Sequence, residues 1–157
     1  MPFISEYVLK QICLQTEKAY PKEACGILIG PKEHHNAIGL FPIKNIQDEL
    51  HAQDPVKYFR TSRNAYYMDP KGVQIVEKEA AHQNFEFKAI YHSHPDHDVY
   101  FSDEDKLMAG PWGEPNNPDL HWVVVSVREG KAVAASLFSW DAEKKDYVEK
   151  KFKLSAH

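Results

Sequence analysis

Two histidines separated by one residue are the first feature of this sequence that could do chemistry. His92 and His94 end an alternating apolar segment that is typical of a β-strand, and Pro95 follows them. Side chains two positions apart on a strand project to the same face, so both imidazoles can hold one metal ion while Ser93 points away. An isolated His-x-His pair is often incidental. A metal site therefore needs a third ligand.

Asp105 is the best candidate for that ligand. Ser102 and Asp105 stand three apart at the start of a predicted helix, where side chains at this spacing face the same point. Catalytic zinc typically keeps three protein ligands and one open position. The same two residues are also typical of an N-terminal capping arrangement, in which a serine caps the helix and an acidic residue follows three positions later. Taken alone, the pair leaves both interpretations open.

The joint spacing is more specific than either pair. His92-x-His94-Pro95, six residues and then Ser102-x-x-Asp105 resembles the signature of the JAMM family, the MPN+ zinc metallopeptidases. The resemblance implies that His92, His94 and Asp105 bind one zinc ion (Zn2+) per chain, with a water molecule in the fourth place. Zinc lowers the pKa of such a water from 15.7 to about 7, so hydroxide exists at neutral pH.

An upstream glutamate extends the resemblance over most of the chain. Residues 21–30, Pro-Lys-Glu-Ala-Cys-Gly-Ile-Leu-Ile-Gly, look like the family's glutamate segment, with Glu23 at the entrance to an apolar strand. The resemblance implies that Glu23 acts as general base and then as general acid. It implies that Ser102 donates a hydrogen bond to the oxyanion of the tetrahedral intermediate. Without the downstream motif, Glu23 is better interpreted as a solvated carboxylate.

The family resemblance also implies a substrate class. JAMM enzymes cleave after the C-terminal glycines of ubiquitin or of ubiquitin-like proteins, including small sulfur carriers, and this chain resembles the compact bacterial and archaeal members. We expect hydrolysis of a peptide or isopeptide bond after the Gly-Gly tail of a ubiquitin-like or sulfur-carrier protein, preferably a carrier bearing a C-terminal amino acid. Two alternatives remain: a non-catalytic MPN-type scaffold that binds other proteins, and a zinc amidase acting on a small peptide.

Two further side chains near these motifs allow two interpretations each. Cys25 follows Glu23 by two residues, so a thiol nucleophile is an alternative, but small cysteines in apolar strands are commonly inert and packing is favoured. Trp112 stands in a loop rich in Gly and Pro, Gly110 to Pro118. It either lines a substrate groove or pins its own loop.

The elements that position these residues follow from apolar spacing and turn signals. Ser5 is a plausible N-cap for a first helix, and Asp69-Pro70 favours the start of another. Helices are predicted at residues 5–19, 70–83 and 102–109. Strands are predicted at residues 24–29 (buried on both faces), 37–43, 85–91 (leading into the histidine motif), 121–127 and 132–140 (a hairpin), and 147–154. Residues 45–69 are polar and mixed, with short elements expected only around 56–59.

Length and composition fit one globular domain. The chain has 157 residues, of which 43% are hydrophobic and 27% charged. Helices around a run of strands, without regular βαβ alternation, predict an α+β fold. We expect residues 1–157 to form a single MPN/JAMM-like domain with a mixed β-sheet flanked by helices.

Charge and hydropathy exclude several partner classes. A net charge of -4 and a sequence pI near 6.1 argue against general nucleic-acid binding. The longest apolar stretches, at residues 24–29 and 122–125, are far shorter than the roughly 20 residues of a membrane span. The N-terminus lacks the basic region of a signal peptide, so we expect a soluble, cytoplasmic protein. Two cysteines cannot form a cysteine-only zinc site. The sequence makes no prediction of the oligomeric state.

Overall fold

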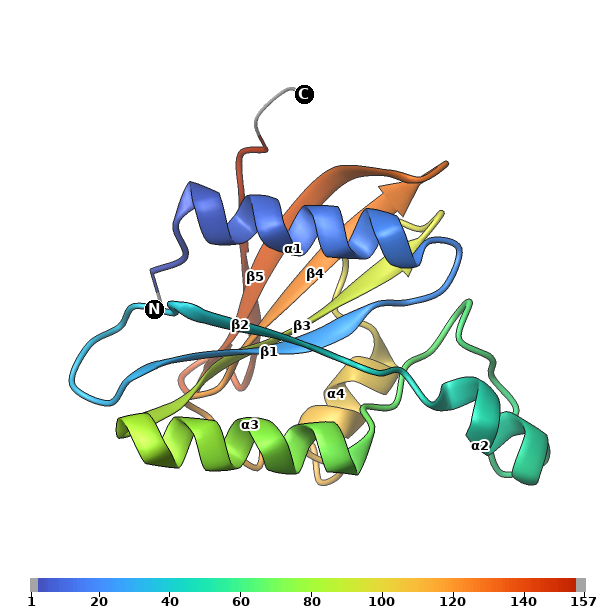
Figure 1. Ribbon diagram of the computed structural model, residues 1–157, viewed down its shortest axis with the longest axis horizontal. Helices are drawn as coiled ribbons and strands as arrows, with labels where there is room; N and C mark the ends of the chain where they lie inside the picture. The colour runs from blue at the N-terminus through green and yellow to red at the C-terminus, as the bar shows by residue number, and fades with distance from the viewer. Residues whose placement is uncertain (1–2, 155–157) are drawn as a thin grey trace.

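A six-stranded mixed β-sheet with helices on both faces positions the motif residues (Figure 1). The structure is a computed structural model and describes residues 3–154. In chain order the elements are α1 (Glu6–Ala19), β1 (Cys25–Pro31), β2 (Gly39–Ile43), α2 (Gln47–Gln53), α3 (Pro70–Gln83), β3 (Phe85–Pro95), α4 (Asp103–Ala109), β4 (His121–Arg128), β5 (Lys131–Asp141) and β6 (Asp146–Lys151). The sheet order is β2-β1-β3-β4-β5-β6, with β3 and β4 parallel and the other neighbours antiparallel. The predicted α+β class is confirmed.

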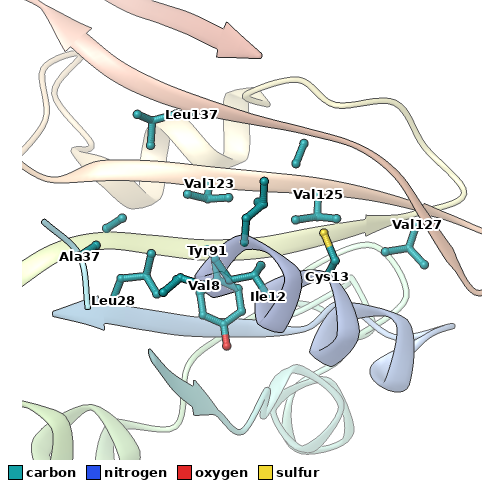
Figure 2. Packing of buried hydrophobic residues seen from close by; sticks show 13 residues of the cluster. Val8, Ile12, Cys13, Leu28, Ala37, Tyr91, Val123, Val125, Val127 and Leu137 are labelled. Carbon is teal, nitrogen blue, oxygen red and sulfur yellow. The ribbon is translucent and has the colours of Figure 1, made fainter. Parts of the chain in front are cut away.

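Helix α1 covers one face of the sheet. Its predicted N-cap is confirmed, because the Ser5 side chain accepts a hydrogen bond from the Val8 N–H at 3.1 Å. Figure 2 shows Ile12 and Cys13 of α1 against strand residues that include Tyr91. The buried cluster on this face contains Val8, Leu9, Ile12, Cys13, Leu28, Ala37, Ala89, Tyr91, Val123, Val125, Val127, Ala135 and Leu137.

Helices α3 and α4 lie on the opposite face (Figure 1). The Asp69 carboxylate accepts a hydrogen bond from the Lys71 N–H at 3.0 Å, which confirms the predicted start of α3 at Pro70. Ile90 of β3 packs on this face with Phe101 and Ala109. Because strand side chains alternate between faces, later even-numbered positions of β3 lie on the face that α3 and α4 cover.

Strand β1 is buried along nearly its whole length, as the apolar run predicts. A glycine is required at its second position. A Cβ atom built on Gly26 would lie 2.2 Å from the ring of Tyr91 on the neighbouring strand β3, which no real contact allows. The bare backbone at Gly26 lets the Tyr91 ring cross β1, so these two strands pair closely where the histidine motif begins.

Several boundaries and one helix differ from the sequence prediction. Strand β1 covers Cys25–Pro31 rather than 24–29, and β5 covers Lys131–Asp141 rather than 132–140. Strand β2 covers Gly39–Ile43 rather than 37–43, and β6 covers Asp146–Lys151 rather than 147–154. Residues 55–58 form a turn and bend, whereas the helix of this region is α2, at Gln47–Gln53. Helix α2 buries only Gln47, so it lacks the apolar stripe by which a helix is predicted. None of the helices between residues 3 and 154 is long and apolar enough to span a membrane.

Candidate metal centre

The histidine motif occupies the end of strand β3. His92 and His94 are buried, with 0% and 6% of their surfaces exposed, and their ring centroids lie 5.1 Å apart. The hydroxyl of Ser93 between them accepts a hydrogen bond from the Ala24 N–H of the segment before β1, at 2.8 Å. Ser93 therefore ties the strand to its neighbour, while the two imidazoles lie together on the face that α4 covers.

Helix α4 brings the predicted third residue to this pair. Oδ1 of Asp105 lies 3.1 Å from Nε2 of His92, and Oδ2 lies 3.6 Å from Nε2 of His94. One ligand atom from each of the three residues can be chosen so that all lie within 4.8 Å of one another. The structure therefore brings together two imidazoles and one carboxylate around a common point.

Asp105 also belongs to a capping box, so the two interpretations of this residue are compatible. The Ser102 hydroxyl oxygen accepts a hydrogen bond from the Asp105 N–H, and Oδ2 of Asp105 accepts one from the Ser102 N–H, both at 3.0 Å. Burial opposes ionisation of Asp105, but the neighbouring His92 and His94 rings and the hydrogen bond from the Ser102 N–H hold its pKa below the usual range. The carboxylate is therefore ionised, as a metal ligand must be.

The hydrogen bonds of the histidines fit a bound metal. Nδ1 of His94 lies 3.0 Å from the Asp98 carbonyl oxygen, so a proton on Nδ1 leaves the Nε2 lone pair facing Asp105. His92 is fully buried, and neither ring nitrogen has a hydrogen-bond partner among residues 3–154. Nε2 of His92 faces Oδ1 of Asp105 without a hydrogen bond, and ligation of a metal through that nitrogen would satisfy it. Two imidazoles and a carboxylate form a donor set typical of zinc.

Tyr66 supports the ring of His92, a role that no motif in the sequence indicates. The two rings stack with centroids 4.6 Å apart and an interplanar angle of 26°. Tyr66 is 4% exposed, and its hydroxyl has no hydrogen-bond partner in the described chain. Burial, followed by the charges of Asp105, Cys25 and Glu23, raises the pKa of Tyr66 well above its usual value. The residue therefore stays neutral beside the cluster.

Strand pairing places Glu23 close to the end of β3. The Ser93 N–H donates to the Ala24 carbonyl oxygen at 3.1 Å, and Cys25 stands opposite His92 in the sheet register. Glu23, one residue earlier, is fixed from the other side, because its N–H donates to the carbonyl oxygen of Ser62 at 2.6 Å. The backbone of Glu23 is thus held between the end of β3 and residues 54–69, the α2–α3 segment.

The Glu23 side chain is buried, which argues against the interpretation of this residue as a solvated carboxylate. Only 7% of Glu23 is exposed. Burial, then the negative charges of Asp105 and Glu104, raise its pKa well above the usual value, while the positive charge of Arg60 partly opposes them. A raised pKa makes it easier for the carboxyl group to take up a proton, as a general base must.

Cys25 has the surroundings of a structural thiol. It is completely buried, and its sulfur lies 3.4 Å from the Ile43 carbonyl oxygen as a hydrogen-bond donor. Burial and the charge of Glu23 raise the pKa of Cys25 to about 12. The nucleophilic thiolate is therefore disfavoured at neutral pH, which supports packing over catalysis.

Solved structures with similar folds include JAB1/MPN proteins. A crystal structure of a JAB1/MPN domain protein from Archaeoglobus fulgidus matches with a TM-score of 0.51 and 18% identity, covering 94% of each chain. Solution structures of a protein from Desulfitobacterium hafniense (TM-score 0.70, 21% identity, 100% of this chain and 94% of that one) and of one from Salinibacter ruber (0.63, 22%, 96% and 90%) are also similar. These likenesses show the fold alone, that of a JAB1/MPN-like domain.

Comparison of the sequence with models of protein families identifies the family. Residues 5–142 match the family described as prokaryotic homologs of the JAB domain, Prok-JAB. The chain belongs to this family. No curated protein matches the chain.

Proposed function

We propose that this protein is a zinc-dependent hydrolase that cleaves a peptide or isopeptide bond after the C-terminal Gly-Gly of a ubiquitin-like or sulfur-carrier protein. The observation that carries the proposal is the convergence of His92, His94 and Asp105 beside a buried Glu23, in a domain of the JAB family. A zinc ion held by the first three residues supplies Lewis-acid activation of water and of the scissile carbonyl.

Glu23 is assigned the proton transfers. One of its carboxylate oxygens accepts the proton of the attacking water and passes it to the nitrogen of the leaving amine. The burial of Glu23 supports this role, because it brings the pKa of the carboxyl group closer to the pH at which it must work in both directions. The negative charges of Asp105 and Glu104 also raise the pKa of Glu23.

Ser102 is assigned the stabilisation of the oxyanion. Its oxygen accepts the N–H of Asp105 within the capping box, and that bond leaves the hydroxyl proton available to donate. Ser102 is only half-buried, so a substrate oxygen can reach it. A preorganised donor of this kind costs no reorganisation during the reaction.

Exposed apolar side chains favour a protein substrate over a small amide. The Tyr100 ring lies 4.8 Å from that of His94 and is 50% exposed, and Phe59 on the α2–α3 segment is 66% exposed. Trp112 follows α4 and is 90% exposed, so it does not pin its own loop. Leu107 and Met108 of α4 are exposed as well. Contiguous apolar patches are typical of surfaces that bind other proteins, and we propose that these side chains contribute to one beside the candidate site.

The proposed function is tested by hydrolysis of a carrier protein whose C-terminal tail has a defined sequence. Purified protein loaded with zinc would be incubated with a ubiquitin-like carrier extended by one residue beyond Gly-Gly, and the released residue would be followed by mass spectrometry. We expect release that stops with a chelator and returns with zinc. Binding of the carrier without any release, by protein that retains its zinc, would instead favour the non-catalytic scaffold.

A further inference from the structure

One cationic side chain lies between the Glu23 segment and helix α4, and the proposed chemistry does not use it. Nε of Arg60 lies 2.9 Å from Oε1 of Glu104, the neighbour of Asp105 in the first turn of α4. Two residues further along, the Ser62 carbonyl oxygen accepts the N–H of Glu23. Arg60 therefore bridges the segment that holds the proposed base and the helix that carries a proposed metal ligand.

The guanidinium of Arg60 has N–H groups that donate no hydrogen bond within residues 3–154. Its Nε is buried, yet the N–H is not aligned for a hydrogen bond with Glu104. The guanidinium lies over the ring of Phe59, 5.3 Å from its centroid, and its terminal nitrogens make no hydrogen bond to any residue between 3 and 154. The side chain is 34% exposed, so those nitrogens are open to a ligand. A guanidinium offers five N–H donors and matches a carboxylate through two parallel hydrogen bonds. The natural complement of this unsatisfied group is an anionic planar ligand.

The position of Arg60 relative to Glu23 indicates which anion it would meet. Arg60 contacts Glu104 beside Asp105, and two residues further along Ser62 holds the backbone of Glu23, so Arg60 lies at the border between these two parts of the site. Glu23 is the group proposed to protonate the leaving amine. In a free C-terminal amino acid a single carbon separates that amine from the α-carboxylate. A side chain that holds this carboxylate must therefore lie near the group that protonates the amine, and the contacts of Arg60 with Glu104 and of Ser62 with Glu23 put Arg60 on that side of the site.

We propose that Arg60 binds the free α-carboxylate of the residue being released, which makes the protein a carboxypeptidase for Gly-Gly-X tails rather than an isopeptidase for lysine side chains. This inference rests on the proposed function. In the reaction the C–N bond between glycine and X breaks, a C–O bond to water forms, and the proton of water reaches the nitrogen of X through Glu23. Arg60 holds X in place and exchanges no proton.

Three substrates on one carrier test this assignment. The first ends in Gly-Gly-Ala with a free carboxylate, the second ends in the same residues with a carboxamide, and the third joins Gly-Gly to the ε-amine of a blocked lysine. We expect kcat/KM of the unaltered protein to be about 10- to 100-fold higher for the first, the size of one lost charged hydrogen-bonding partner. Arg60→Gln should abolish that preference, because it raises KM for the free acid and not for the carboxamide.

Two further variants separate a binding role from a structural one. Arg63→Gln removes an exposed cation from the same segment and should change nothing. Glu104→Gln breaks the ion pair but leaves Arg60, so the preference should persist. If Arg60→Gln and Glu104→Gln lowered cleavage of all three substrates alike, Arg60 would have only a structural role, that of holding the α2–α3 segment against α4. Equal cleavage of acid and carboxamide by the unaltered protein also overturns the inference. Failure to cleave any of the three overturns the proposed function itself.

Discussion

One carboxylate, that of Asp105, connects local structure to the candidate centre. Oδ2 accepts the Ser102 N–H and thereby starts helix α4, while Oδ1 is directed at His92. The capping geometry removes the rotational freedom that a metal ligand would otherwise lose on binding. A sequence pattern that is common at helix starts is therefore also able to preorganise a metal site.

The role of Glu23 is tested by Glu23→Gln. The amide keeps the shape of the side chain but cannot accept a proton, so hydrolysis should fall by about 10²- to 10⁴-fold while bound zinc is retained. Initial rates and elemental analysis of the same samples check both parts. Glu33→Gln, which alters an exposed glutamate, is the matched control. Full activity of Glu23→Gln would refute the assignment.

Tyr66 gives a second prediction at this scale, through its stack on His92. Tyr66→Ala should weaken zinc affinity about 10-fold, because an unsupported imidazole loses its orientation. Tyr66→Phe should keep the affinity, and it should not reduce stability because the buried hydroxyl has no partner to lose. Competitive titration with a chromophoric chelator measures both affinities. Equal weakening by the two variants would show that the hydroxyl, not the stack, matters.

Helix α4 is the element on which the site depends, and Ser102 is its cap. Ser102→Ala should destabilise the metal-free protein by about 1 kcal/mol in urea unfolding, and should lower hydrolysis by ~10²- to 10³-fold. Ser102→Asp restores a capping acceptor but has no proton to donate. Its stability should recover while its activity stays low. If activity returned together with stability, Ser102 would act only through the helix.

The regular elements and the clustering of His92, His94 and Asp105 were predictable from the sequence, whereas ligation of a metal by these residues stays a prediction. Most of the signals are local. The apolar spacing of α1, the Asp69-Pro70 start of α3 and the histidine spacing on β3 each depend on a few neighbouring residues. Helix α2 was missed because its stability depends on distant partners: Gln47 donates to the Arg60 carbonyl oxygen at 3.0 Å. Tyr66 was missed for the same reason, since only the folded chain brings it to the histidines.

The whole molecule assembles the candidate centre from separate parts of the chain. Pairing of β1 with β3 brings Glu23 to the end of the strand that carries the histidines. The parallel pairing of β3 with β4 extends to Pro95, and the connection between these two strands contains α4, which carries Asp105. The α2–α3 segment then adds Tyr66 and Arg60. The centre therefore exists only in the folded domain, so metal binding and folding should be coupled.

Acid stability tests the packing at the far end of the sheet, at the start of β4. Burial, together with positive charges that include His35 and Lys88, lowers the pKa of His121 from 6.5 to about 4. Between these two values the unfolded chain binds a proton that the folded chain does not, so the free energy of unfolding of the metal-free protein falls as the pH falls.

His121→Gln should flatten this part of the pH profile. Urea unfolding at several pH values from 7 to 4, with chelator present, measures how the free energy of unfolding changes with pH in the unaltered protein and in the variant. The variant should lose less stability than the unaltered protein over the window, because its side chain does not titrate. Parallel profiles would show that His121 is not held neutral in the folded state.

The metal content of the purified protein tests the central claim most directly. Elemental analysis after reconstitution with zinc and removal of the excess would compare the unaltered protein with His94→Ala and with His97→Ala, which alters an exposed histidine three residues away. We expect about one zinc per chain in the unaltered protein and in His97→Ala, and none in His94→Ala. A protein that holds no zinc, or that keeps it after His94→Ala, would contradict the metal centre and the hydrolase built on it.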